Sequence, residues 1–302
     1  MTTEQWGIRV PVKEGEEKRR ELLHNGTLDN TLKIRHDENF LIFPITSKNS
    51  DSTRYLFEEQ PNRTDIPRHE TIGGIAIMQE DDCEGAVSIL ASRPSLHTVL
   101  FPTSEVTGEF RTREYKVLAG KPTTRTEVVE HGHRFVIDLS TAYFSARLST
   151  ERQRIAEKVS REETVLDMFA GVGPFAIVIA CRAALVMAAD LNPRAIHLML
   201  ENIKRNKVSN VLPILADASH LRSLHLGKFD RIIMNLPLAG TMFLPDAFQL
   251  VQSGGTIHFY SLVSQEGEHL ERIYQLGGKE VTERIVRSYS PGQWHAVYDI
   301  TT

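Results

Sequence analysis

Residues 164–180, TVLDMFAGVGPFAIVIA, constrain the fold more than any other part of the chain. An apolar run that ends in Asp167 is followed by Gly171 and Gly173 and then by a second apolar run, which predicts a buried strand, a tight turn and a helix. The glycines let the backbone turn sharply and approach a ligand closely, because they carry no Cβ. The third glycine of a dinucleotide fingerprint and the Lys-Ser/Thr pair of a P-loop are both missing.

Three further predicted strands also end in polar residues. LVMAAD ends at Asp190, where an acid can accept hydrogen bonds from a ribose. VLPILAD ends at Asp217, and FDRIIMN ends at Asn235, directly before Leu-Pro. Because the carboxyl ends of parallel strands share one edge, these residues predict a Rossmann-like α/β sheet with a single ligand crevice. The pattern resembles an S-adenosylmethionine site, and the alternative is a purely structural set of turns.

Composition places the chain among ordinary soluble globular proteins. Its 302 residues suffice for two domains and a small third, with 41% hydrophobic and 25% charged residues. We find no apolar segment long enough to span a membrane and no signal-peptide pattern at the start, so we expect a cytoplasmic protein without membrane association. Cys83 and Cys181 make no metal-binding spacing and are expected to be reduced thiols.

Charge is distributed unevenly along the chain. The net charge is −4, but residues 111–160 hold ten Lys or Arg against six Asp or Glu. A basic segment beside a cofactor domain suits a polyanionic substrate such as RNA, although such runs are more often solvated helix faces.

The remaining patterns divide the chain into three expected domains, which are residues 1–48, 55–140 and 141–302. The first is a small α+β unit, with strands at 10–12, 32–34 and 39–44 and a helix at 14–23. Its core is marginal for its size, and the polar run 47–53 is expected to be a linker. The second is a mixed α+β unit, for which we expect strands at 72–78, 87–90, 98–101, 113–118 and 135–137.

Within the cofactor domain we expect a helix at 193–206, a strand at 254–261 and two final strands within 283–300, joined by the turn SPGQ.

Two segments carry charged residues whose simplest explanation is structural. EFRTRE, residues 109–114, would place Arg111 and Arg113 on one face of a strand, and a solvated edge strand explains them by itself. In YFSARLSTERQR, Ser149 or Thr150 is expected to cap a helix, and Glu151 in its first turn would interact favourably with the helix dipole.

Five segments together resemble the archaeal and eukaryotic-type tRNA (guanine-37-N1)-methyltransferases. They occur in family order, cover essentially residues 100–300, and are GEFRTRE, YFSARLSTERQRI, DMFAGVGPF, MNLP and VRSYSPG. DMFAGVGPF alone would be shared with other RNA methyltransferases, whereas its combination with the other segments is more specific. Residues 1–48 resemble the small tRNA-contacting domain of the family. Leu238 departs from the pattern, since a lysine is expected there, and leucine supplies no cation at this position.

The resemblance implies a Rossmann-like class I methyltransferase domain at the C-terminus, preceded by a mixed α+β RNA-binding domain and a small N-terminal α+β domain. It also implies S-adenosylmethionine as the cofactor. The residues that it assigns to cofactor binding are Arg152, Asp167, Phe169, Ala170, Gly171, Gly173, Asp190, Leu191, Asp217, Ala218 and Asn235.

The implied reaction needs a base, because guanine N1 carries a proton at neutral pH, and a partner for O6, where negative charge develops. Glu151 is the candidate base, and Arg111 is the candidate O6 partner, with Arg113 as the alternative. Asn235 would hold the Watson–Crick edge, while Tyr143 and Pro237 would form the walls of the base pocket. We expect no metal, because methyl transfer requires none and the 12 histidines form no ligand cluster.

The expected partner is tRNA, contacted at its anticodon loop and outer corner by a monomeric enzyme. One alternative is a wyosine-pathway enzyme on the same fold, which methylates the tricyclic intermediate or transfers an aminocarboxypropyl group, alone or beside the first activity. A protein-glutamine or DNA methyltransferase is disfavoured, because NLPL replaces the Asn-Pro-Pro-Tyr or Asp-Pro-Pro-Tyr of those enzymes. A non-catalytic RNA-binding protein is the remaining alternative, which a cofactor titration separates from the others.

Overall fold

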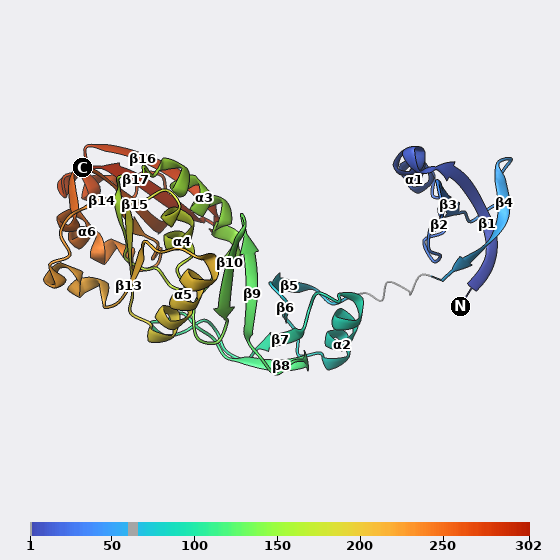
Figure 1. The fold of residues 1–302 in the computed structure, drawn as a ribbon, viewed down its shortest axis with the longest axis horizontal. Coiled ribbons are helices and arrows are strands. Elements are labelled where there is room, and N and C mark those ends of the chain that lie inside the picture. Colours follow the sequence, from blue (N-terminus) through green and yellow to red (C-terminus); the bar gives the residue numbers. More distant parts are fainter. Residues whose placement is uncertain (1, 60–65) are drawn as a thin grey trace. The chain divides into compact units, whose positions relative to one another are not determined.

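The computed structural model describes residues 2–59 and 66–302, which belong to two compact units (Figure 1). The first unit is Met1–Pro67 and the second is Arg68–Thr302.

In its described residues, the first unit is an antiparallel four-stranded sheet with one α-helix. The sheet order is β2-β3-β1-β4. The elements are β1 (Thr2–Pro11), the 3-10 turn η1 (Val12–Glu14), α1 (Gly15–His24), β2 (Arg35–Asp37), β3 (Phe40–Pro44) and β4 (Ser52–Glu58). Leu22 of α1 packs against Ile8 and Phe43 of the sheet, which forms the small core expected for a unit of this size.

Two predictions for this unit were wrong. Residues 32–34 make only an isolated bridge from Leu32 to Glu59, and the strand begins at Arg35. The segment 47–53 is not an interdomain linker, because β4 begins at Ser52 and pairs with β1 from Ile8↔Ser52 to Thr2↔Glu58. The boundary expected at residue 48 therefore moves to Pro67. Only Phe57 of β4 is buried, and the apolar run of its sequence, Tyr55–Phe57, is too short to indicate a strand by itself.

The second unit begins with a four-stranded sheet of order β5-β6-β7-β8. Its elements are β5 (His69–Ile72), β6 (Ile75–Met78), α2 (Cys83–Ser92), β7 (Thr98–Pro102) and β8 (Tyr115–Gly120). The strand predicted at 87–90 is wrong, since these residues lie in α2. The Asp82 carboxylate caps that helix by accepting from the backbone N–H groups of Glu84 and Gly85. The strand predicted for residues 109–114 is also wrong. This segment is a turn in which Arg111 has a φ of 52°.

A hairpin of β9 (Arg125–Glu130) and β10 (His133–Asp138) joins this sheet to the rest of the unit. The buried side chain of Asn202 donates to the carbonyls of Val136 and Val172 and accepts from the backbone N–H of Val136. One hydrophobic core runs from Ile75 through Phe135 to Ile177. The boundary expected at residue 140 therefore lies inside one compact unit.

The seven-stranded sheet has the order β13-β12-β11-β14-β15-β17-β16, with the first five strands parallel and the last two antiparallel to their neighbours. Its strands are β11 (Thr164–Asp167), β12 (Leu185–Asp190), β13 (Val211–Leu215), β14 (Phe229–Met234), β15 (Val251–Val263), β16 (Glu280–Ser290) and β17 (Gln293–Thr301). This confirms the predicted α/β class, the strand-end pattern and the final strand pair.

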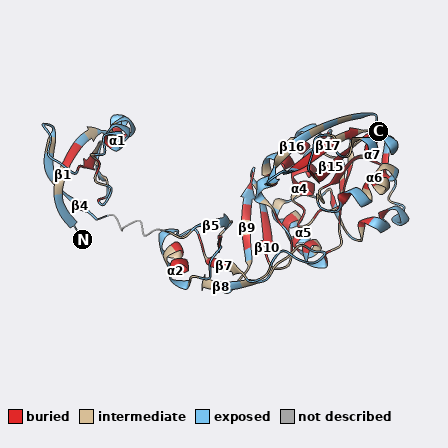
Figure 2. Cartoon of the chain, turned by 180° about the vertical axis from the view of Figure 1, so that it is seen from behind, coloured by how far each residue is buried: buried red, intermediate tan, exposed pale blue. Residues whose placement is uncertain are grey.

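Alternate residues of a strand point to opposite sides of the sheet. Both sides of this sheet carry apolar residues, and helices cover each of them. Val165 and Ile233 belong to one core, while Leu166 and Ile232 belong to the other. The first core is covered by α3 (Ser149–Lys158), α4 (Pro174–Ala180) and α5 (Pro193–Asn206), and the second by α6 (Leu244–Leu250) and α7 (Leu270–Gln275). Figure 2 shows buried stretches of the sheet and of α4 and α5 in red. Short 3-10 turns are η2 (Ala146–Leu148), η3 (Ala218–Leu224) and η4 (Gly240–Phe243). Among the described residues, no helix combines the length and the apolar character needed to cross a membrane.

Candidate active site

A cavity opens at the carboxyl ends of β11, β12 and β14, where the strand order reverses. Most of the residues expected to bind a cofactor line it. These are Arg152, Phe169, Ala170, Gly171, Asp190, Leu191, Asp217, Ala218 and Asn235. The remaining two, Asp167 and Gly173, do not line it.

The loop after β11 is shaped by its two glycines and by Asp167. Gly171 and Gly173 both adopt positive φ angles, of 55° and 83°. A Cβ on Gly173 would lie 2.7 Å from Cγ of Met199, so this glycine allows close packing against α5. Asp167 is 1% exposed, and burial raises the pKa of its carboxyl to about 7. Its Oδ2 has no hydrogen-bond partner among the described residues.

Asp190 fixes the same loop from the end of β12. Its Oδ2 accepts from the backbone N–H of Gly171 at 2.6 Å, and its Oδ1 accepts from that of Asn192 at 2.8 Å. Burial raises the pKa of Asp190, although these two hydrogen bonds act to lower it. At the end of β13, Asp217 caps η3 by accepting from Ser219, which lowers its pKa. Both acids therefore line the cavity at the ends of neighbouring strands, and their ribose and adenine roles stay predictions.

The other end of the cavity gathers the residues expected to hold a nucleobase. The Arg111 guanidinium lies over the Tyr143 ring at 4.9 Å, and Asn235 and Pro237 line the same space. Arg113 lies outside the lining, with its guanidinium 5.9 Å from the ring of Tyr115. The geometry thus places Arg111 at the cavity and Arg113 away from it.

Four lining side chains at this end have buried polar atoms without a partner in the described parts of the chain. The atoms are Nε of Arg111, Oδ1 of Asn235, Nε of Arg287 and both ring nitrogens of His295. Buried polar groups are normally paired, because an unpaired one loses its hydration without compensation. These atoms are therefore available to bind a ligand that has several hydrogen-bonding atoms.

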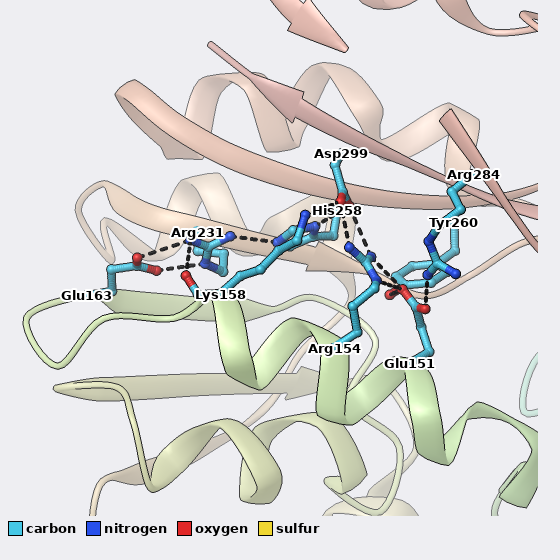
Figure 3. A network of polar contacts seen from close by, with 9 residues as sticks. All are labelled: Glu151, Arg154, Lys158, Glu163, Arg231, His258, Tyr260, Arg284 and Asp299. Atoms are coloured by element: carbon cyan, nitrogen blue, oxygen red, sulfur yellow. Dashed lines mark hydrogen bonds and ion pairs between the residues drawn. The ribbon is translucent and has the colours of Figure 1, made fainter. Parts of the chain in front are cut away.

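Glu151 lies outside the cavity lining and is only 4% exposed. Its Oε1 accepts from Nε of Arg154 and from the hydroxyl of Tyr260, both at 2.8 Å, and its Oε2 accepts from Arg284 (Figure 3). Although burial raises the pKa of Glu151, these hydrogen bonds hold it below the usual value. The carboxylate is thus kept ionised next to the site.

Two details of α3 differ from the sequence-based expectation. Neither Ser149 nor Thr150 caps the helix, which begins at Ser149 after η2 and has no side-chain cap at Leu148. Arg152 lines the cavity but is 2% exposed and donates from Nε and Nη2 to Glu130 and from Nη2 to the carbonyl of Ser145. Any contact of Arg152 with a ligand would have to coexist with this buried ion pair.

Sequence reasoning missed Arg287 and His295 as lining residues. Arg287 lies within VRSYSPG, which resembled the family, but no role was assigned to it. His295 lies in QWHAVYDI, for which the sequence predicted only part of the final strand pair, and no role was assigned to it. Among the described residues, no group of three or more His, Cys, Asp or Glu side chains could hold a metal ion.

The sheet order and the cavity define a Rossmann-like α/β protein with a nucleotide-type site at its topological switch point. The family model described as the TRM5/TYW2 methyltransferase domain matches residues 126–283, and the tRNA methyltransferase 5 N-terminal domain matches residues 7–53. The chain belongs to the TRM5/TYW2 methyltransferase family.

Curated relatives match over most of the chain. It is 39% identical to tRNA (guanine(37)-N(1))-methyltransferase Trm5b of Pyrococcus abyssi, over 97% of both chains. It is 37% identical to tRNA 4-demethylwyosine(37)-methyltransferase Taw21 of Saccharolobus solfataricus, over 81% of this chain and 98% of that protein.

Solved structures of related proteins show the same fold. The complex of aTrm5 and tRNALeu superposes with a TM-score of 0.77, at 32% identity over 98% of this chain and 99% of that one. The TYW2 protein of Methanocaldococcus jannaschii, solved in complex with AdoMet, superposes with a TM-score of 0.63, at 30% identity over 78% of this chain and 98% of that one.

Proposed function

We infer that this protein transfers a methyl group from S-adenosylmethionine to N1 of guanosine 37 in tRNA, next to the anticodon. The observation that carries this inference is the cavity itself. One end presents strand-end carboxylates, and the other presents unpaired donors and acceptors from Arg111, Asn235 and His295. The relative from Pyrococcus abyssi, which matches over nearly its full length, carries this activity in its name.

The strand-end half of the cavity fits S-adenosylmethionine. Asp190 and Leu191 would hold the ribose, and Asp217 and Ala218 would lie near the adenine. The buried, unpaired Oδ2 of Asp167 suits a cationic ligand, because a positive charge nearby would stabilise the ionised carboxyl. When bound, S-adenosylmethionine supplies a methyl group activated by its positively charged sulfur. The chain's own residues then have to orient the base and remove one proton.

The other half suits a guanine that has left the anticodon stack. Arg111 would donate to O6, where negative charge develops as N1 loses its proton. Asn235 would hold the Watson–Crick edge, and Tyr143 and Pro237 would cover the ring faces. Glu151, ionised and held by Arg154 and Arg284, is the candidate base that would accept the N1 proton.

The N-terminal unit would contact the tRNA away from the target base, at its outer corner, while the second unit holds the anticodon loop. The family model for the first unit covers residues 7–53, and a relative of nearly equal length has been solved with tRNALeu. We expect the enzyme to act as a monomer, without a metal, in the cytoplasm.

Methylation of the wyosine intermediate is the second candidate activity, and the relative from Saccharolobus solfataricus favours it. That relative matches 81% of this chain, however, whereas the relative from Pyrococcus abyssi matches 97%. The broader match favours guanosine 37 as the primary target.

One assay distinguishes these activities. The protein is incubated with labelled S-adenosylmethionine and either unmodified tRNA transcripts with G or A at position 37 or tRNA that carries the 4-demethylwyosine intermediate. The modified nucleosides are then identified after digestion. We expect 1-methylguanosine from the G37 transcript and no product from the A37 transcript. Label in the wyosine substrate alone would replace the proposed activity by the second candidate.

A further inference from the structure

His295 lies at the nucleobase end of the cavity. It comes from β17, is 2% exposed, and lines the cavity together with Arg111, Asn235 and Arg287. Both of its ring nitrogens are buried and have no hydrogen-bond partner among the described residues. A core histidine normally satisfies at least one nitrogen, as His258 does with Asp299, so these two free nitrogens require an explanation.

Strand geometry places His295 next to the residues that hold Glu151. Leu262 of β15 pairs with His295, and Tyr260 pairs with Val297. Since residues two apart in a strand share a face, the rings of Tyr260 and His295 lie on the same side of the sheet, 5.8 Å apart. The Tyr260 hydroxyl donates to Glu151. His295 thus reaches the cavity, whereas Glu151 lies behind it.

The charges around His295 keep its imidazole neutral. Burial, with Arg287 and Arg111, lowers the pKa of His295 to about 4, against the opposing effect of Glu151. A neutral imidazole carries one N–H donor and one acceptor nitrogen, so it can take a proton on one side while it releases another.

Glu151 is anchored where it stands. Its Oε1 is held by Tyr260 and Arg154, and Nη1 of Arg154 in turn donates to Asp299 at 2.6 Å (Figure 3). Its Oε2 accepts from Arg284, whose side chain is 43% exposed. Moving the carboxylate into the cavity would break these ion pairs, so a proton from the cavity reaches it more easily through an intermediate group.

We propose that His295 is a further catalytic residue, which takes the proton of guanine N1 on one ring nitrogen and passes the proton of the other nitrogen to Glu151. This proposal rests on the proposed function. The N1–H bond breaks, and the freed lone pair forms the bond to the methyl carbon. The methyl–sulfur bond breaks, with its electron pair left on sulfur. His295 ends neutral as its other tautomer, and Glu151 ends as a neutral acid that later loses its proton to solvent.

The first test replaces the imidazole in the full-length protein. His295→Gln keeps hydrogen-bonding groups but cannot carry a proton, so we expect single-turnover methyl transfer to fall by about 10²–10⁴-fold. The affinity for S-adenosylmethionine, measured by calorimetry, should stay within about twofold, since the strand-end carboxylates are untouched. His197→Gln is the matched control, because His197 is exposed on α5, and it should leave both values unchanged.

Chemical rescue separates proton transfer from positioning. His295→Ala leaves space beside the cavity, so added imidazole should restore part of the rate, and more basic imidazoles should restore more. A slow His295→Ala variant that no imidazole rescues would overturn the relay. A His295→Gln variant with the wild-type rate would overturn it as well. Wild-type protein that methylates no G37 transcript would instead overturn the proposed function.

A binding readout tests the contact without turnover. The side-chain nitrogens of His295 are identified in protein labelled with ¹⁵N-histidine by comparison with His295→Gln. With S-adenosylhomocysteine present, addition of the G37 tRNA transcript should shift these signals, because one nitrogen gains a hydrogen bond to N1–H. Unchanged His295 signals in the saturated complex would contradict the proposed contact.

Discussion

At the scale of single residues, the environment of Glu151 decides what its carboxylate can do. A glutamate in the first turn of a helix normally needs only the helix dipole to explain it. Here two arginines and a tyrosine surround the carboxylate, which is 4% exposed. These contacts keep the carboxylate ionised at neutral pH, so it has room for a proton, but by lowering its pKa they also make it a weaker base than an ordinary glutamate.

The first prediction concerns Glu151→Gln. We expect single-turnover methyl transfer to fall by about 10²–10⁴-fold, because glutamine cannot accept the proton. Raising the pH should partly restore the rate, since solvent then removes the proton. The free energy of unfolding should fall by about 1–3 kcal/mol, because Arg154 and Arg284 lose a charged partner.

A denaturant titration and a pH series measure these two effects, and the cofactor affinity serves as the control. A Gln variant with wild-type rates throughout the pH range would remove Glu151 from the mechanism.

The second prediction concerns Asp190→Ala. The variant loses the expected ribose contact and also the hydrogen bond that fixes Gly171. S-adenosylmethionine binding should therefore weaken by about 1–3 kcal/mol, the usual result of leaving buried polar groups unpaired. Calorimetry measures this change. Asp246→Ala, whose side chain pairs with Arg222 away from the cavity, is the control and should bind as the wild type does. Undiminished affinity in Asp190→Ala would contradict the assignment of the ribose contact.

At the scale of elements, α3 is joined to the sheet by a row of polar contacts that runs along one face of β15 and β17 (Figure 3). Asp299 accepts from Arg154 and Lys158 of α3 and from His258 of β15. Arg231 can only donate, so Nε2 of His258 accepts from it and Nδ1–H faces Asp299. Arg231 also pairs with Glu163. This row fixes the helix that carries Glu151 and Arg152.

The third prediction concerns Asp299→Asn. Burial raises the pKa of Asp299, but hydrogen bonds from His258, Arg154 and Lys158 outweigh this effect and hold the pKa well below its usual value of 3.8. A depressed native pKa stabilises the fold above the unfolded pKa and stops doing so as the pH falls through the native value. The variant should therefore lose about 2–4 kcal/mol of unfolding free energy at pH 7.

Below pH 4 the difference between the wild type and Asp299→Asn should shrink. Denaturant titrations at several pH values measure it. A constant difference across this range would show that the ionised carboxylate does not stabilise the contact.

At the scale of the whole molecule, the chain divides at residue 67, between a unit that resembles the family's N-terminal domain and a unit that holds the cavity. The second unit encloses every element that lines the cavity. The basic segment 111–160 also belongs to it, but seven of its ten cations form ion pairs, which are Lys116, Arg125, Arg134, Arg147, Arg152, Arg154 and Lys158. Much of that positive charge is therefore structural and contributes little to RNA attraction.

The fourth prediction follows from this division. A protein of residues 68–302 should bind S-adenosylmethionine as the full chain does. Its affinity for tRNA should fall by about 10²-fold or more, because one of two linked contact regions is gone. Calorimetry and a tRNA-binding titration measure these values.

A protein that begins at residue 50 is the comparison. It keeps β4 without its partner β1, so it should aggregate more readily than residues 68–302 through the unpaired strand edge. Loss of cofactor binding in a folded protein of residues 68–302 would contradict the independence of the two units.

The sequence by itself determined the sheet, the strand ends and most of the residues with which these strand ends line the cavity. Apolar runs and glycine turns are local signals, and parallel strands necessarily bring Asp190, Asp217 and Asn235 to one edge. The turn at Gly171 could also be predicted from the sequence, because positive φ angles favour glycine. Strand β4 and helix α2 were misassigned, since the first has one buried residue and the second is a short apolar run that also fits a strand.

Only the tertiary structure decided the chemistry around Glu151. Its distance along the chain from Tyr260, Arg284 and His295 exceeds 100 residues, so no local pattern links them. The predicted strand put Arg111 and Arg113 on the same face, so the sequence could not distinguish them. In the structure the segment is a turn with a left-handed φ at Arg111, and only Arg111 lines the cavity. Burial and protonation of these groups arise from contacts between distant strands and α3, and such contacts exist only once the sheet has formed.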